Sequence, residues 1–287
     1  MFVYQKYVPE ETAGKSGKAG STKQSYGPPV SLLLSVVFLR KLYSSSRRCG
    51  IMSETLKANT EYAKKLKTML KLRREPVAVK LIKEGETYPN GPVQPQSQIS
   101  HCQAVFRATR GECFKLPFEA HNCHVGTAVL GMNETPAKAA SGEFHAGVGI
   151  HDSVAAAKKM IDERLLIPYK TVGEVVCPLK DADFVPDAVV MIDIPERLYW
   201  VVGMMTAEKG GRANFSTAPF QCACEDVVSY PIVSRAPNIS LGCFGCRKRT
   251  DMASDELACG IPFYLIPGYV SRLEKYSEGP LANAKRD

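Results

Sequence analysis

The residues with the clearest chemical potential lie in the stretch of residues 237–249, which reads PNISLGCFGCRKR. It holds Cys243 and Cys246 in Cys-x-x-Cys spacing, two glycines that free the backbone, and three consecutive cations. Thiolates at this spacing can bind one metal ion or one face of an iron–sulfur cluster. A second close pair, Cys222 and Cys224, precedes the stretch. The sequence therefore predicts a thiolate site without naming a reaction.

The spacing of these pairs leaves three kinds of site open. About 18 residues separate the two pairs, which is close to a zinc ribbon with its usual two Cys-x-x-Cys pairs. An iron–sulfur cluster would use the same thiolates. A metal-free enzyme would instead use Cys243 or Cys246 as its nucleophile, with Arg247 lowering the pKa of the thiol.

Composition and charge narrow the class of partner. With 45% hydrophobic and 23% charged residues the chain has an ordinary globular composition. The net charge is +8, but residues 1–51 supply six of these charges and residues 52–287 carry only +2. Because residues 52–287 are nearly neutral, they offer little electrostatic attraction for a nucleic acid, and we expect no nucleic-acid partner. Ten cysteines in 287 residues, arranged in close pairs, favour metal thiolates over disulfide crosslinks, and we expect a reducing cytoplasm.

Residues 1–51 differ from the rest of the chain, because they are basic and rich in Ser, Gly and Lys. Their apolar run, residues 30–39, is too short to span a bilayer, which takes about 20 residues. It is also preceded by too long and too acidic a stretch for a signal peptide. We therefore expect an unstructured or mis-assigned leader over residues 1–51, a true start at Met52, and a single domain over residues 52–287.

The elements that must position the thiols alternate along the chain. Helical patterns and short β-branched runs follow one another, which predicts an α/β or mixed α+β fold. The sequence has no internal repeat, no Gly-x-Gly-x-x-Gly motif and no phosphate-binding loop. The expected helices cover residues 53–72, 101–109, 120–132, 154–164, 195–207 and 220–229. The expected strands cover residues 77–82, 111–116, 172–176 and 188–192, with a loop over residues 84–98.

Several of these segments resemble a single family. They read EPVAVKLIKEGE at residues 75–86, CQAVFRATRGE at 102–112, SGEFHAGVG at 141–149, CEDVVSYP at 224–231, PNISLGCFGCR at 237–247 and GIP at 260–262. From about Lys57 to Gly268 the chain is similar to the uncharacterised prokaryotic family called domain of unknown function 169, which is common in methanogens and other anaerobes. That family has no settled activity, so the resemblance leaves open whether the protein is an enzyme.

The resemblance singles out four cysteine positions, which here are Cys102, Cys123, Cys224 and Cys243. Four thiolates are the ligand set of a [4Fe–4S] cluster. The resemblance thus implies a cytoplasmic iron–sulfur protein of anaerobic metabolism, with an electron-transfer or cluster-dependent redox role and a redox partner protein. Cys222 and Cys246 depart from the family pattern and rank as alternates. A zinc-binding structural or assembly module on the two close pairs would leave Cys102 and Cys123 without a role.

The remaining cysteines and histidines carry weaker expectations. Cys177 lies in the apolar run VVCPL, so we interpret it as a small buried hydrophobe. Cys113 and Cys259 lie beside glycines or acidic residues and stay undecided, whereas Cys49 falls in the leader. The catalytic candidates are His145, within SGEFHAGVG, and Arg247, directly after Cys246. Histidines that flank the candidate thiolates are His101, His121 and His124.

Overall fold

A six-stranded antiparallel sheet forms the centre of the computed structural model, which describes residues 53–279. Its strands follow the order β2-β3-β1-β4-β6-β5. They are β1 (Val77–Lys83), β2 (Phe114–Pro117), β3 (Thr171–Pro178), β4 (Ala188–Asp193), β5 (Asn238–Ser240) and β6 (Leu257–Pro262). The mixed α/β class is thereby confirmed, while residues 1–52, including the expected leader, lie outside the described part.

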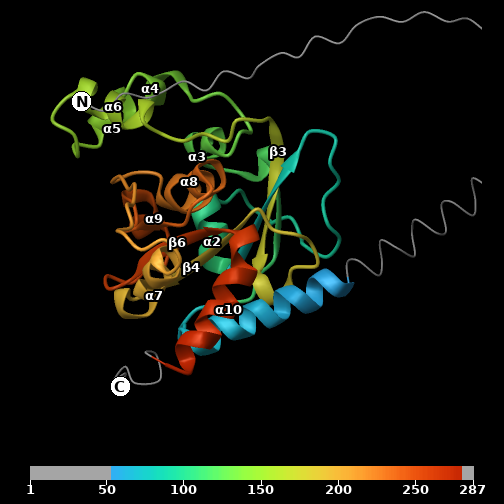
Figure 1. Ribbon diagram of the computed structural model, residues 1–287. Helices are drawn as coiled ribbons and strands as arrows, with labels where there is room; N and C mark the ends of the chain where they lie inside the picture. The colour runs from blue at the N-terminus through green and yellow to red at the C-terminus, as the bar shows by residue number, and fades with distance from the viewer. Residues whose placement is uncertain (1–52, 280–287) are drawn as a thin grey trace, which may run out of the picture. The chain divides into compact units, whose positions relative to one another are not determined.

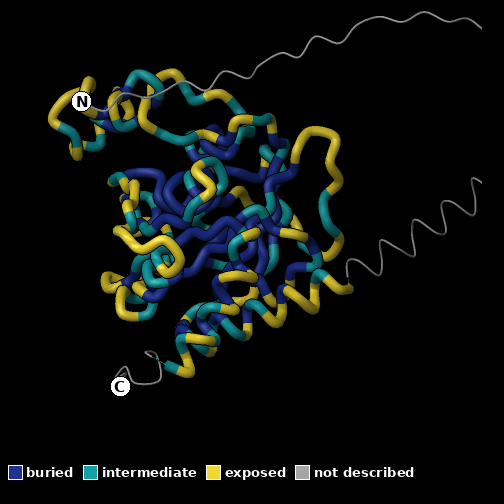
Figure 2. The backbone as a smooth tube through the Cα atoms, in the orientation of Figure 1, coloured by how far each residue is buried: buried dark blue, intermediate teal, exposed yellow. Residues whose placement is uncertain are grey.

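Alternation along the strands gives the sheet two apolar faces, because successive side chains of a strand point to opposite sides. On β1, Val77, Val79 and Leu81 join one buried cluster, whereas Ala78 and Ile82 join the other. Both clusters are covered by helices, so the strands read as continuous apolar runs, and this is why residues 77–82 and 188–192 were predictable. Figure 2 shows the buried chain segments between the two outer layers.

One face of the sheet carries long helices. The helix of residues 53–69, α7 (Pro195–Thr206) and α10 (Ile266–Ser277) pack there with buried leucines such as Leu66, Leu198 and Leu273. Figure 1 shows α10 beside the helix of residues 53–69, and an ion pair of 2.8 Å between Lys65 and Glu274 joins the two. Within the described chain no helix has both the length and the apolar character needed to cross a bilayer.

The other face carries short helices and the candidate thiols. The elements there are α2 (His101–Ala108), α3 (His124–Val129), the π-helix η3 (Cys222–Ser229), α8 (Tyr230–Ser234) and α9 (Phe244–Arg249). Gly260 of β6 allows the closest approach, because a Cβ at this position would collide with the backbone of Val227 in η3. The π-helix therefore lies directly on the strand, and π-helices of this kind are frequent at functional sites.

The remaining elements are short connections. They are the turns η1 (Phe118–Ala120), η2 (Leu179–Asp181) and η4 (Phe263–Leu265), and the helices α4 (Ala137–Ala140), α5 (Glu143–Gly147) and α6 (Val154–Asp162). Ser153 caps α6, because its hydroxyl accepts a hydrogen bond of 3.1 Å from the backbone N–H of Ala156. The expected helix of residues 120–132 is shorter in the structure, where α3 covers only His124–Val129, because His121 pairs with Ile99 in an isolated β-bridge and the chain bends at Asn122.

The interpretation of Cys177 as an isolated buried hydrophobe is wrong in one respect. Its side chain is fully buried on β3, but it forms a disulfide with Cys113, 64 residues earlier. The pairing of β2 with β3 explains the bond, because Phe114 lies opposite Val176 and the next position brings Cys113 opposite Cys177. Because the bond depends on which residues of β2 and β3 lie opposite each other, the spacing of the cysteines in the sequence does not predict it.

Candidate functional site

Cys102 is positioned by the first turn of α2. Ser100 caps this helix in a capping box with Gln103, in which each side chain bonds the other residue's backbone N–H. The Ser100 hydroxyl also lies 3.0 Å from the Cys102 sulfur. Hydrogen bonds from Cys246 and Ser100 outweigh burial and lower the pKa of Cys102 to about 7.

Cys243 occupies the N-cap position of α9. Its sulfur accepts a hydrogen bond of 3.4 Å from the backbone N–H of Cys246. The Cys246 thiol and the backbone N–H groups of Cys246, Cys222 and Gly245 together lower the pKa of Cys243 to about 6. Of the four cysteines that the sequence singled out, Cys243 is the best prepared to be a thiolate.

Cys123 and Cys224 face each other across Gly126 of α3. A Cβ at Gly126 would lie 3.5 Å from the Cys123 sulfur and 3.6 Å from the Cys224 sulfur, so the bare backbone leaves room between two thiols. Burial raises the pKa of Cys123 despite hydrogen bonds from the backbone of α3, and it raises that of Cys224 further. At Cys123 desolvation thus outweighs the backbone N–H groups at the start of α3, which favour the thiolate.

These four cysteines and Cys246 line one cavity of about 210 Å³. Four elements of the chain supply them, since Cys102 comes from α2, Cys123 precedes α3, Cys224 lies in η3, and Cys243 and Cys246 begin α9. The lining includes Lys248, Arg249 and His101, and no aspartate or glutamate is part of it. The structure thus brings together every cysteine of the predicted set.

Cys246 lies at the centre of the thiol group. Cys102, Cys222 and Cys243 are all within hydrogen-bond reach of its single thiol proton, and these contacts raise the pKa of Cys246 well above the ordinary value. Cys222 is buried and contacts Cys246, but it does not line the cavity. Of the two alternates, Cys246 therefore has direct access to a guest and Cys222 does not.

A buried ion pair between His101 and Glu174 supports the thiol group from the sheet side. The His101 ring nitrogen Nδ1 lies 2.7 Å from Glu174 Oε2, and Nε2 lies 2.9 Å from the carbonyl oxygen of Ala223. Both partners are acceptors, so both ring nitrogens donate and the ring is an imidazolium. Burial opposes this charge, but the Glu174 carboxylate outweighs it and raises the pKa of His101. The pair fixes α2 against β3 and η3, next to Cys102.

The other histidines have different surroundings. Burial lowers the pKa of His121, whose Nε2 lies 3.6 Å from Glu174. His124 is exposed and stacks on Phe118. His145 of α5 is 1% exposed, lines the cavity, and has a Nδ1 atom without a hydrogen-bond partner among the described residues. Burial lowers its pKa to about 4.

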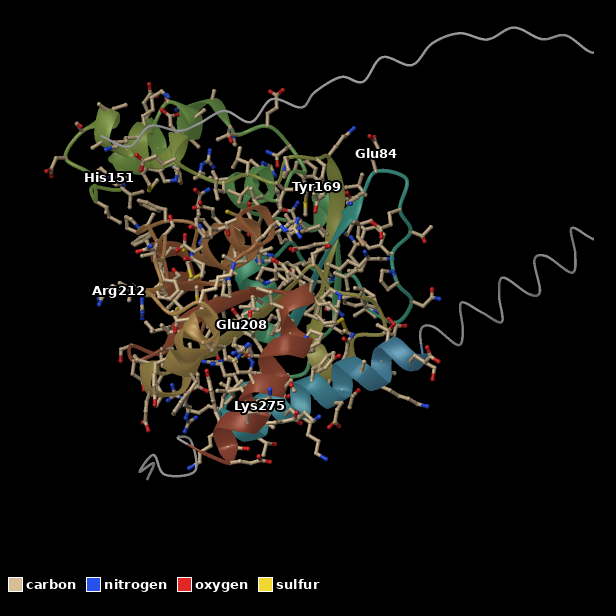
Figure 3. The ribbon with its side chains drawn as sticks, viewed as in Figure 1. Glu84, His151, Tyr169, Glu208, Arg212 and Lys275 are labelled. Carbon is tan, nitrogen blue, oxygen red and sulfur yellow. A yellow bond between two sulfur atoms is a disulfide. The ribbon has the colours of Figure 1, made fainter. Side chains whose placement is uncertain are left out.

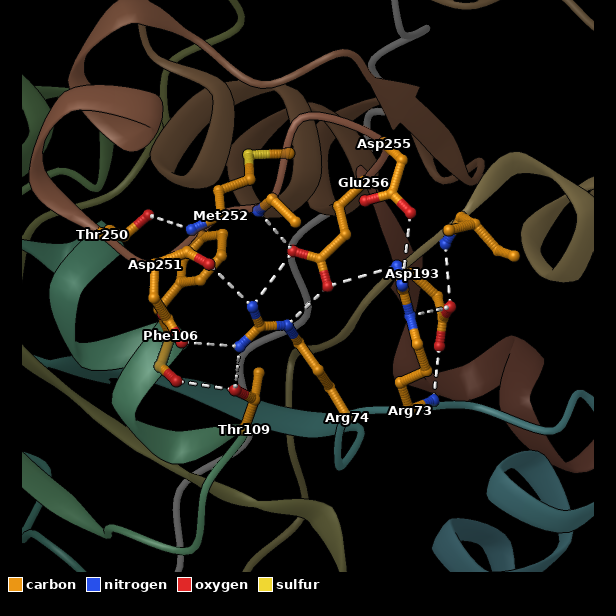
Figure 4. Close-up of polar contacts among 12 residues, drawn as sticks. Arg73, Arg74, Phe106, Thr109, Asp193, Thr250, Asp251, Met252, Asp255 and Glu256 are labelled. Carbon is orange, nitrogen blue, oxygen red and sulfur yellow. Dashed lines mark hydrogen bonds and ion pairs between the residues drawn. The ribbon is translucent and has the colours of Figure 1, made fainter.

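Arg247 does not line the cavity. Its guanidinium donates hydrogen bonds to the backbone carbonyls of Leu241, Ala253 and Glu256, so it closes the loops around α9. Arg74 donates to the carboxylate of Glu256 at 2.7 Å and to Asp251 at 3.0 Å, as Figure 4 shows. The contacts of Arg247 hold α9 against the neighbouring loops and so help to position Cys243 and Cys246.

A second cavity of about 330 Å³ lies on the other side of η3. It is lined by His151, which lies between α5 and α6 (Figure 3), by Lys159, and by the η3 residues Glu225 and Asp226. Burial raises the pKa of Asp226 to about 8, although the hydroxyls of Ser240 and Thr217 donate to its carboxylate. Sequence reasoning missed this cavity, for which the CEDVVSYP segment was the available signal.

No three His, Cys, Asp or Glu side chains within residues 53–279 are grouped as a single metal ion would need. The lining of the cavity combines the thiols with backbone and aromatic groups. What the arrangement offers is a thiol-lined space with two cations at its rim.

Comparison with known proteins gives a family and no activity. The family model for uncharacterised ArCR, domain of unknown function 169, matches residues 65–272. An uncharacterized protein of Methanocaldococcus jannaschii is 30% identical over 221 residues, which is 76% of this chain and 94% of the relative. No solved structure matches the chain. The resemblance seen in the sequence is thereby confirmed, and the chain belongs to the uncharacterised ArCR family, domain of unknown function 169.

Proposed function

We propose that Cys102, Cys123, Cys224 and Cys243 bind an iron–sulfur cluster of the [4Fe–4S] type. The observation that carries this proposal is the convergence of these four thiols, from four separate elements, on one cavity. Such clusters are held by four cysteine thiolates, and their ligands need no regular spacing when the fold assembles them.

The residues present fit such a cluster in three respects. Gly126 leaves open the space between two of the sulfurs, where a side chain would fill it. The cavity is rimmed by Lys248 and Arg249, whose charges offset those of thiolates. Backbone N–H groups also donate to the Cys243 sulfur, an interaction that tunes cluster potentials.

Zinc fits less well. A structural zinc site draws four ligands to about 2.0–2.3 Å from one ion, and so needs them tightly grouped. The described residues contain no such group, and the two pairs of a zinc ribbon are split, since Cys222 lies behind Cys246 and outside the lining. The spread of the thiols favours a guest larger than one ion.

With a cluster in place, the protein would have an electron-transfer or cluster-dependent redox role in anaerobic metabolism, in the cytoplasm and with a redox partner protein. The cluster would supply the one-electron chemistry. The chain's own residues would exclude water, hold the thiolates, and offset their charge. The family resemblance and the gathering of free thiols support this role.

The test is anaerobic purification of the full chain followed by analysis for iron, zinc and acid-labile sulfide. We expect about four iron and four sulfide per chain, with a visible absorption band and, after reduction, an EPR signal. A colourless protein with one zinc per chain and no sulfide would contradict the proposal.

A second candidate function is thiol–disulfide exchange by Cys243 and Cys246. It is favoured by the lowered pKa of Cys243, to about 6, and by the adjacent Cys246 thiol that could resolve a mixed disulfide. Metal-free protein treated with limiting iodoacetamide distinguishes the two functions. Rapid alkylation of Cys243 alone would support exchange, whereas slow and uniform labelling of the thiols would argue against it.

A further inference from the structure

The thiols occupy only part of the cavity. Another part of its lining is largely apolar and includes Phe144, Phe220 and Phe244 with Val125 and Val148. We call this part the aromatic end. It is built by α5, by Val125 of α3, by the segment before η3 and by α9. The last two are joined, because the backbone N–H of Phe244 donates a hydrogen bond of 2.8 Å to the carbonyl oxygen of Pro219.

His145 is the polar group of the aromatic end. Its ring is 1% exposed and packs edge-on against Phe144 at 5.0 Å and Phe220 at 4.7 Å between ring centroids. Nδ1 is buried and has no hydrogen-bond partner among the described residues. A buried polar atom left unpaired is destabilising, and such exceptions are commonly explained by a missing ligand or by water.

The charges at the mouth of the cavity have one sign. The Lys248 ammonium lies 5.4 Å from the centroid of the Phe244 ring, at the aromatic end. Arg249 also lines the cavity, and its charge acts on Cys123. No carboxylate is part of the lining, so the mouth attracts anions.

We propose that the aromatic end binds a small organic anion with an apolar body, held by a hydrogen bond to His145 and by the charge of Lys248. The body packs against Phe220 and Phe244, and the anionic group lies toward the rim. A cavity of about 210 Å³ is smaller than the usual ligand pocket of about 300–1,000 Å³, so the anion has few heavy atoms. That this anion is the substrate of a cluster-dependent reaction rests on the proposed function, whereas its binding does not.

The experiment uses benzoate as the probe and benzamide as its neutral counterpart, with the full chain in metal-free and metal-loaded forms. Binding is measured by ligand-detected NMR and by the shifts of the His145 ring resonances. We expect benzoate to bind and benzamide to bind about tenfold more weakly. We expect Lys248→Gln to weaken benzoate binding about fivefold, as does the loss of one ion pair, and His145→Phe to weaken it by a similar factor. Lys209→Gln, at an exposed lysine outside the lining, is the matched control.

Three results would overturn the proposal. They are no benzoate binding to either form, equal binding of benzoate and benzamide, or equal affinities of the Lys248→Gln and Lys209→Gln variants. Metal and sulfide analysis of the same samples is read separately. If anaerobically purified protein contains no cluster but still binds benzoate, the proposed function ends and the anion site stands. If a bound cluster excludes benzoate, the substrate role ends.

Discussion

The two faces of the sheet treat the same residue type in different ways. On the face of the long helices, Cys259 is fully buried among apolar side chains, and burial raises its pKa to about 12. Cys113 and Cys177, on the same side, are bonded to each other. On the opposite face five free thiols line one cavity, and a sixth, Cys222, contacts Cys246 outside the lining.

The two faces of the sheet also differ in how regularly their side chains are packed. The long-helix face is filled by leucine, isoleucine, valine and methionine, and its cysteines are either inert or crosslinked. The short-helix face gives up regular packing, since it contains a π-helix, a buried imidazolium and an unpaired histidine nitrogen. Departures from regular packing are expected where function has been placed. The following predictions test that division of labour.

The largest expected effect comes from cysteine replacement on the two faces. Cys224→Ser removes a proposed ligand, so we expect at least a tenfold loss of iron bound by anaerobically prepared protein. Cys259→Ser places a hydroxyl among apolar side chains and lowers the stability by about 1–3 kcal/mol. Iron per folded chain should then stay unchanged. Equal loss of iron in the two variants would abolish the distinction between the faces.

Gly126→Ala tests the space between two sulfurs with little change to the metal-free fold. The new methyl group would lie 3.5 Å and 3.6 Å from the sulfurs of Cys123 and Cys224, which is ordinary contact in the metal-free protein. Alanine also favours the helix by up to about 1 kcal/mol. We expect unchanged or higher thermal stability without metal and a several-fold loss of bound iron. Full iron loading in this variant would show that the guest does not use this space.

Glu174→Gln tests the ion pair behind the thiols. The change leaves His101 charged and buried without its carboxylate, and breaking such a pair costs about 3–5 kcal/mol. Urea unfolding of the metal-free protein measures this loss. Exposed Glu143→Gln is the control and should change the free energy of unfolding by less than about 0.5 kcal/mol. A near-neutral Glu174→Gln would mean that His101 is uncharged in the fold.

Leu66→Ala gives the counterpart on the long-helix face. Leu66 is fully buried, and its truncation costs about 2–5 kcal/mol through lost burial and a cavity. Iron per folded chain should not fall, because no thiol of the cavity touches this layer. Measured together by urea unfolding and iron analysis, the Leu66 and Glu174 variants separate damage to the core from damage to the site.

The sequence predicted some of this arrangement and had no means of predicting the rest. The strands of residues 77–82 and 188–192 were readable because both faces of the sheet are apolar there. The four cysteines came from a family resemblance, and their convergence on a cavity followed from tertiary packing. The Cys113–Cys177 bond depends on the register of β2 and β3, and the His101–Glu174 pair joins residues 73 positions apart. Neither contact produces a periodic pattern in the sequence from which it could be predicted.

The smallest expected effect is a pH dependence from His145. Its pKa falls from about 6.5 in the unfolded chain to about 4 in the fold, chiefly because burial disfavours the charged ring. Between these values the unfolded chain binds more protons, so the free energy of unfolding increases with pH, and stability is lost as the pH falls from 6.5 to 4. His145→Phe removes this contribution, and the difference in melting temperature between wild type and variant should therefore shift against the wild type on acidification. Parallel melting curves across this range would mean that the ring is hydrated in the fold, which would also remove the main argument for a ligand at the aromatic end.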